Sequence, residues 1–179
     1  MRKTRARAPM RVSLAGGGTD LEEYFSLFGG ASLNIAISRY ANVVVEEVHG
    51  FFEFVGRDTG FREIYSNISD ALDGSKTLFA ACLSFFSSVY GANPSGLRIV
   101  AHVDCPQGAG LGASSTLTVA LVKAMARFFD VPLGDYDLVR VAISVEREIA
   151  GVPGGHQDHF AAVFGGINFI EFDRSGSSR

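Results

Sequence analysis

The sequence predicts an α+β or α/β fold of two layers, in which a sheet packs against helices. Short runs of apolar and β-branched residues are typical of strands, and longer segments repeat apolar residues at helical spacing. The expected strands are 10–15, 32–39, 42–48, 51–55, 97–103 and 167–172, and the expected helices are 75–90, 114–129 and 137–150. Strands 42–48 and 51–55 are close enough along the chain to predict a hairpin. Helix 114–129 is apolar on nearly every side, so we expect it to lie deep in the fold.

Composition narrows the classes of protein. The 179 residues are 47% hydrophobic and 20% charged, with a net charge of −3, which suits one globular domain and argues against a nucleic-acid binder. No run approaches the roughly 18 apolar residues of a membrane span. The basic segment 2–11 is followed by too short an apolar run for a targeting signal, and we expect it to be a solvated lead-in. With only Cys82 and Cys105 as cysteines, we expect a cytoplasmic protein without nucleic-acid or membrane partners.

Glycine is abundant, with 21 residues gathered in a few clusters. The first cluster follows a predicted strand and contains Gly16, Gly17, Gly18, Thr19 and Asp20. Glycines let the backbone approach a ligand closely, and Thr19 and Asp20 add short polar groups. The alternative is a tight turn in which Asp20 caps a helix that begins at residue 21. Three glycines exceed what a turn needs, so the cluster favours a ligand site.

The second cluster joins strand 97–103 to the buried helix. Its residues, apart from Gln107, are Pro106, Gly108, Ala109, Gly110, Leu111, Gly112, Ala113, Ser114 and Ser115. A glycine-rich loop that enters a helix N-terminus is typical of phosphate binding, and a serine in the first turn can place its hydroxyl on Mg²⁺. The Walker pattern is absent because no lysine follows the glycines. A dinucleotide pattern, Gly108-x-Gly110-x-x-Ala113, is present, but Asp130 ends the helix instead of a second strand, so this match is weak.

The last two signals are carboxylates. Glu146 falls on the apolar arc of helix 137–150 together with Ile149, which predicts either a buried salt bridge or a Mg²⁺ ligand. A glycine-rich turn at 151–155 then presents Asp158, which could serve as a general base or could cap the helix that follows. His156 and His159 flank Asp158, but their spacing does not favour a zinc site.

Three segments together resemble the GHMP kinase superfamily, and they occur in its order: RAPMRVSLAGGGTD (7–20), PQGAGLGASS (106–115) and EREIAGVPGGHQD (146–158). The resemblance is strongest to heptose 7-phosphate kinases and related sugar kinases. It implies a two-layer α/β sandwich of the GHMP N-terminal type over residues 1–173. Members of the family continue into a second domain with another glycine-rich motif, which nothing in this sequence matches, so we expect the C-terminal domain to be absent here and the Ser/Gly-rich residues 174–179 to form a flexible tail. We therefore expect self-association or a missing half, with weak turnover alone.

The same resemblance implies roles for individual residues. ATP phosphates would lie on the loop 106–115, with Mg²⁺ held by Ser115 and Glu146. Asp158, assisted by Arg11, would take the proton from an anomeric hydroxyl. The substrate side would comprise Gly16, Gly17, Gly18, Thr19, Asp20, Gly155 and His156.

Two positions depart from the heptose-kinase pattern, because His156 and His159 stand where Lys and Gln are common. A histidine is a weaker phosphate partner than a lysine, which leaves open an unphosphorylated sugar such as fucose or galactose. Two other classes also remain open: a non-catalytic sugar or nucleotide sensor, and a dinucleotide oxidoreductase.

Overall fold

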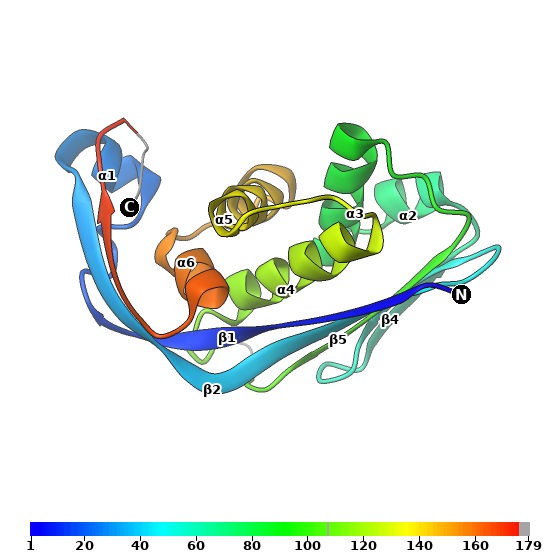
Figure 1. Cartoon of the computed structure of the whole chain (residues 1–179), viewed down its shortest axis with the longest axis horizontal. Helices are drawn as coiled ribbons and strands as arrows, with labels where there is room; N and C mark the ends of the chain where they lie inside the picture. Colours follow the sequence, from blue (N-terminus) through cyan, green and yellow to red (C-terminus); the bar gives the residue numbers. More distant parts are fainter. Residues whose placement is uncertain (107, 176–179) are drawn as a thin grey trace.

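The computed structural model describes residues 1–106 and 108–175; Gln107 and the tail residues 176–179 lie outside the described part. One layer is a mixed sheet in the order β1-β2-β5-β3-β4, with β6 also paired to β2. The helices lie together on one face of this sheet (Figure 1). The strands are β1 (Lys3–Ala15), β2 (Gly30–Glu47), β3 (Phe52–Gly56), β4 (Phe61–Tyr65), β5 (Leu97–Val103) and β6 (Ile167–Phe172). The predicted two-layer fold is confirmed.

The helical layer has six α-helices and one π-helical turn within the described residues. They are α1 (Glu22–Phe28), α2 (Ile68–Gly74), α3 (Leu78–Tyr90), α4 (Ala113–Phe128), α5 (Asp135–Ile143), the π turn η1 (Ser144–Ile149) and α6 (Gln157–Phe164). Helix α4 is buried at eleven of its sixteen residues and forms the centre of the main core, as its largely apolar sequence predicts. Within the described residues, no helix combines the length and apolarity that crossing a bilayer requires.

Strand β2 pairs with β1, β5 and β6, and it joins two segments that the sequence predicts as separate strands. Its residues 41–47 pair with β5, while its residues 30–35 pair with β6, so one long strand serves two parts of the sheet. The basic segment at the N-terminus is not a loose lead-in either, because β1 begins at Lys3 and pairs with β2 along its length. The side chains of Lys3, Arg5 and Arg7 are exposed on this edge strand, whereas Arg11 is partly buried.

The predicted hairpin between 42–48 and 51–55 is wrong. Strand β5 lies between β2 and β3, and β3 runs parallel to β5. The residues that connect β2 to β3 instead form hydrogen bonds with the start of β5. Val48 N donates to Gly96 O, and Leu97 N donates to Phe51 O. A Cβ at Gly96 would lie 2.6 Å from Val48 O, so this crossing needs glycine. Proximity along the chain predicted that 51–55 pairs with 42–48, but β5, which is more distant in the sequence, takes that place beside β2.

The predicted helix 137–150 also needs correction, because it changes character at Ser144. Helix α5 begins at Asp135 and ends at Ile143, and the chain continues as the wider π turn η1. A rotation of 100° per residue does not hold through a π turn, and such turns are frequent at functional sites. Ile149, which the helical pattern places on the apolar arc, is 43% exposed, whereas Glu146 is fully buried.

Candidate active site

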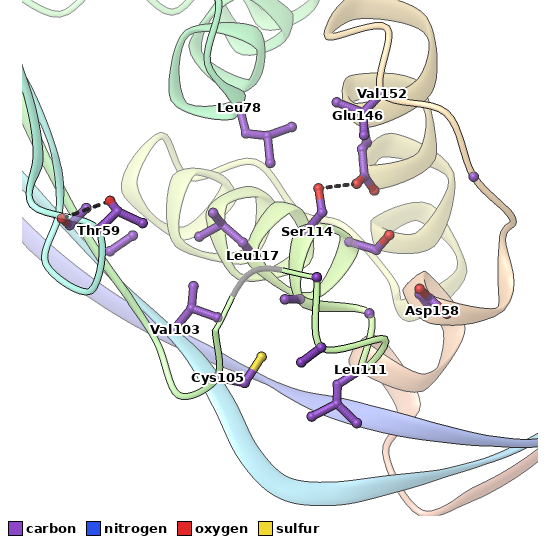
Figure 2. A pocket seen from close by; sticks show the side chains of 18 of the residues that line it. Thr59, Leu78, Val103, Cys105, Leu111, Ser114, Leu117, Glu146, Val152 and Asp158 are labelled. Atoms are coloured by element: carbon purple, nitrogen blue, oxygen red, sulfur yellow. Dashed lines mark hydrogen bonds between the residues drawn. The ribbon is translucent and has the colours of Figure 1, made fainter.

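A cavity of about 740 Å³ opens where the glycine-rich loop enters α4. One wall contains the residues 108–115, and the facing wall contains Glu146, Arg147, residues 152–155 and Asp158 (Figure 2). A third, largely apolar wall comes from the sheet, the residues just beyond β5, α3 and the first turns of α4, with Phe61, Leu78, Phe79, Val103, Cys105 and Leu117. The cavity therefore joins an apolar pocket to a polar end lined by glycines and carboxylates.

The glycine-rich loop reaches its shape through left-handed backbone at Gly108, Gly110 and Gly112. Gly112 is the N-cap of α4 and supplies no side-chain cap. The first residues of the helix, 113–115, line the cavity directly. A helix N-terminus that is open in this way attracts anions, because its free N–H groups and the helix dipole both favour negative charge.

Glu146 is the most deeply buried carboxylate of this wall, with its side chain fully out of solvent. Its Oε2 lies 2.7 Å from His159 Nε2, and its Oε1 accepts a hydrogen bond of 2.6 Å from Ser114 Oγ. Burial alone would raise the pKa of Glu146, but the hydrogen bond and charge of His159, the Ser114 hydroxyl and the nearby Arg147 outweigh it and lower the pKa. The predicted inward orientation of Glu146 is therefore confirmed, and the carboxylate remains ionised.

The serine beside Glu146 is Ser114, whereas the sequence paired Glu146 with Ser115. Ser115 Oγ accepts a hydrogen bond of 3.2 Å from Arg147 Nη2, so it faces a cation. Arg147 also donates to Val152 O and Gly155 O at 2.8 Å each, and it thereby fixes the turn that leads to α6. Neighbouring residues on a helix point about 100° apart, which separates the two hydroxyls. A metal role for Ser115 stays a prediction.

Asp158 lies in the first turn of α6 and not in a loop, and His156 is the N-cap of that helix, so the alternative in which Asp158 is the cap is wrong. Its Oδ1 accepts a hydrogen bond of 2.6 Å from Arg11 Nε, and Arg11 Nη1 also donates to Gly110 O at 2.7 Å. Strand β1, the glycine loop and α6 thus meet at one ion pair. Burial raises the pKa of Asp158, although the charge of Arg11 opposes this rise.

The first glycine cluster lies beside this ion pair but does not line the cavity. Asp20 is only 4% exposed and does not cap α1, whose N-cap is Leu21. Its Oδ2 instead accepts from Gln157 N, the first residue of α6, at 3.1 Å. A Cβ at Gly155 would lie 1.9 Å from that oxygen. The Thr19 hydroxyl bonds to Gly16 O and Ala31 O, which leaves Gly17 and Gly18 as the exposed members of the cluster.

His156 packs into a small aromatic cluster. Its ring centroid lies 5.3 Å from that of Phe25 and 6.5 Å from that of Phe172, both edge-on. Burial, together with the charges of His159 and Arg147, lowers the pKa of His156 to about 4. The imidazole is therefore neutral near pH 7, which weakens the expectation that it serves as a cationic partner for a phosphate.

Comparison with known proteins identifies this arrangement. The profile of the GHMP kinases N terminal domain matches residues 77–166, which is half of the chain and contains both the glycine loop and Asp158. The chain belongs to the GHMP kinase family. GHMP kinases use ATP, and the match places the loop 108–115 and both carboxylates within the family's N-terminal domain.

Several relatives are sugar kinases by name. The chain is 37% identical over 174 residues to the D-glycero-alpha-D-manno-heptose 7-phosphate kinase of Campylobacter jejuni subsp. jejuni serotype O:2, with 96% of this chain and 51% of the relative covered. It is 26% identical over 168 residues to a galactokinase of Thermosipho africanus, with 94% and 45% covered. The chain spans about half the length of the curated relatives it matches.

A solved structure confirms the fold of this GHMP kinase domain. The crystal structure of a D-glycero-D-manno-heptose 1-phosphate kinase from Bacteroides thetaiotaomicron matches with a TM-score of 0.91 at 37% identity, and it covers 98% of this chain and 58% of that one. A putative sugar kinase from Campylobacter jejuni matches with a TM-score of 0.83 at 34% identity, over 100% and 55% of the two chains.

Two residues of this GHMP kinase site were not found from the sequence, His159 and Arg147. The sequence suggests His159 only as a zinc ligand or a weak phosphate partner, although the apolar residues 160–163 that follow it could have signalled a buried partner for Glu146. A regular helix over 137–150 would place Arg147 on its solvent side, opposite Glu146. The π turn brings it over the glycine loop instead, where its side chain is only 15% exposed.

Proposed function

We propose that this chain is the ATP- and sugar-binding half of a sugar kinase, which transfers the γ-phosphoryl group of ATP to an anomeric hydroxyl. Residues 1–173 would form this domain. The observation that carries the proposal is the Asp158–Arg11 pair, in which Asp158 lines the polar end of the cavity and Arg11 also binds Gly110 O of the glycine-rich loop. A base beside a phosphate-binding loop suits phosphoryl transfer to a hydroxyl.

In this mechanism Asp158 accepts the proton of the attacking hydroxyl. Its raised pKa makes the carboxylate a stronger base than an exposed aspartate, while Arg11 keeps it ionised and faces the negative charge that develops during transfer. Arg11 also binds Gly110 O, so the base and the phosphate loop keep a fixed distance. The protein's contribution is positioning and charge stabilisation, with no covalent step.

The donor set next to the loop fits Mg²⁺. Glu146 and Ser114 offer a carboxylate and a hydroxyl oxygen, the hard ligands that Mg²⁺ prefers, and they lie at the mouth of an anion-binding helix N-terminus. Within the described residues no group of three His, Cys, Asp or Glu converges, so phosphate oxygens would complete the coordination. Ser114 and Glu146 would hold the ion, since Ser115 faces Arg147 instead of Glu146. Bound Mg²⁺ neutralises phosphate charge.

We propose D-glycero-D-manno-heptose 7-phosphate as the sugar, on the basis of the Campylobacter jejuni relative's name. The exposed backbone of Gly17 and Gly18 would contact it most directly, because the side chains of Thr19 and Asp20 already have protein partners. His156 and Gly155 would border the same side. Because His156 is neutral, it would attract a sugar phosphate less than a lysine would. This position would therefore influence the choice between a phosphorylated and an unphosphorylated sugar.

The test begins with calorimetric titration of Mg·ATP into the chain, followed by ADP release under single-turnover conditions with a panel of heptose 7-phosphate, fucose and galactose. We expect ATP binding, and slow ADP release that depends on one sugar. In Asp158→Asn the release rate should fall at least about 100-fold, because the amide cannot accept the proton, while the Kd for Mg·ATP should change less than about threefold.

The matched control is Asp73→Asn, which makes the same chemical change on exposed α2 and should alter neither quantity. Binding of NAD(H) without ATP would contradict the kinase proposal. ATP binding without turnover, unaffected by Asp158→Asn, would indicate a sensor. Full steady-state turnover by the chain alone would refute the expectation that it is half of an enzyme.

A further inference from the structure

His159 and Glu146 form a buried pair between two elements of the site. Glu146 belongs to the π turn η1 and His159 to α6, and both side chains have no exposed surface. Their contact, 2.7 Å from Nε2 to Oε2, reaches the carboxylate from the protein interior. His159 Nδ1 has no hydrogen-bond partner in the described structure. The Nε2–H group of His159 donates to the carboxylate, so a hydrogen bond fixes this side of Glu146.

The two oxygens of Glu146 therefore have different surroundings. Oε2 is fixed by His159, whereas Oε1 faces the loop, where Ser114 Oγ lies at 2.6 Å and Arg147 Nη1 at 3.5 Å. Figure 2 shows the Glu146 carboxylate directed at Ser114. The terminal torsion of a glutamate is broad, so a carboxylate held at one oxygen can still swing. Contacts on both oxygens define one orientation.

We propose that His159 is a positioning residue, which holds Oε2 of Glu146 so that Oε1 stays presented to Ser114 and to the Mg²⁺ of the phosphate site. The inference rests on the proposed function, because it takes Glu146 as a ligand of that ion. Residue 159 also follows Asp158 directly on α6. One short helix then sets both the base and the orientation of the metal-binding carboxylate, which ties the two halves of the site together.

The consequence is a specific dependence of Mg²⁺ affinity on residue 159. Removal of a hydrogen-bond partner that orients a ligating group typically weakens metal binding 10–100-fold. In His159→Leu, which has no donor, we expect the Mg²⁺ concentration that half-saturates ATP binding to rise by about that factor, with ATP affinity in EDTA unchanged. In His159→Gln the amide can donate to Oε2, and the value should stay within about threefold of wild type.

The control separates positioning from mere stability. Phe160→Leu alters the next residue of the same helix, which is also buried, without touching Glu146. It should lower the melting temperature and leave the Mg²⁺ dependence unchanged. The experiment is calorimetric titration of ATP at a series of Mg²⁺ concentrations, below the melting temperature of every variant. If His159→Leu does not fold, His159→Asn takes its place, since its shorter amide does not reach Oε2, and at least a fivefold shift is expected.

The outcomes are distinct. A selective shift in His159→Leu with rescue by His159→Gln supports the inference. If wild type binds ATP in a Mg²⁺-dependent way and His159→Leu shifts no more than Phe160→Leu, the positioning role is refuted and the proposed function stands. If wild type shows no Mg²⁺-dependent ATP binding, the proposed function fails and the role of His159 fails with it.

Discussion

Replacement of Asp20 by alanine tests the view that this buried carboxylate ties the first glycine turn to α6. Its Oδ1 accepts from Gly18 N and its Oδ2 from Gln157 N, both at 3.1 Å, while its main-chain oxygen accepts from His156 N. Asp20→Ala removes both side-chain acceptors. The N–H groups of Gly18 and Gln157 then lose these partners beside residue 20, which is only 4% exposed. The N-terminus of α6, the helix that carries Asp158, should therefore become less stable.

The size of the effect follows from these two bonds. A hydrogen bond to a charged group contributes about 1.5–3 kcal/mol, so the loss of two predicts roughly 3–6 kcal/mol. Release of a buried charge and entry of water into the gap offset part of this loss. We therefore expect Asp20→Ala to lower the free energy of unfolding by about 3 kcal/mol, and Asp20→Asn, which keeps one acceptor, by about 2 kcal/mol.

The assay is urea unfolding followed by far-ultraviolet circular dichroism, with the free energy taken from the midpoint and slope. Asp73→Asn, exposed on α2, is the matched control and should stay within about 0.5 kcal/mol of wild type. Gly155→Ala keeps the carboxylate but places a Cβ 1.9 Å from Oδ2, so it should destabilise in the same direction. A loss below about 1 kcal/mol in Asp20→Ala, or one no larger than in Asp73→Asn, would refute this reasoning.

Two further predictions concern the loop and the aromatic cluster. Gly112 and Gly108 both have left-handed backbone, but only a Cβ at Gly112 meets Asp158, 2.8 Å from Oδ2. Gly112→Ala should therefore slow ADP release at least about tenfold. Gly108→Ala should lower the free energy of unfolding by only about 1 kcal/mol, through backbone strain, and should slow ADP release less. Equal losses of activity in the two variants would contradict the contact with Asp158. For His156, the folded pKa of about 4 lies below the unfolded value near 6.5, so the unfolded state binds more protons between these pH values. Stability should be complete above pH 6.5 and fall as the pH drops towards 4, by roughly 3 kcal/mol at most and about 1–2 kcal/mol after solvent screening of the partly exposed ring. Urea titrations at pH 7, 5.5 and 4.5 measure the free energy of unfolding of wild type and of His156→Phe. If this free energy changes with pH in the same way in both proteins, the prediction is disproved.

Much of the fold and of the phosphate site could be predicted from local pattern. The apolar sequence of residues 114–129 predicted a buried central helix, and α4 is that helix. The spacing of glycines before it predicted an open helix N-terminus, which forms one wall of the cavity. These features depend on periodicity and backbone freedom within a few residues, and such properties are written in the local sequence. The inward orientation of Glu146 was predicted in the same way.

Only the tertiary structure decided which groups meet. Strand β5 displaced the expected hairpin, because pairing is settled by the packing of distant segments and not by short connections. The π turn determined that Arg147 turns to the loop, and α6 brought His159 to Glu146 and Gln157 N to Asp20. The sequence by itself thus determined the family's glycine loop and the carboxylates available for chemistry. The partners of those carboxylates, Ser114 and His159 for Glu146, depend on contacts between segments 13 to 32 residues apart, which no local pattern encodes.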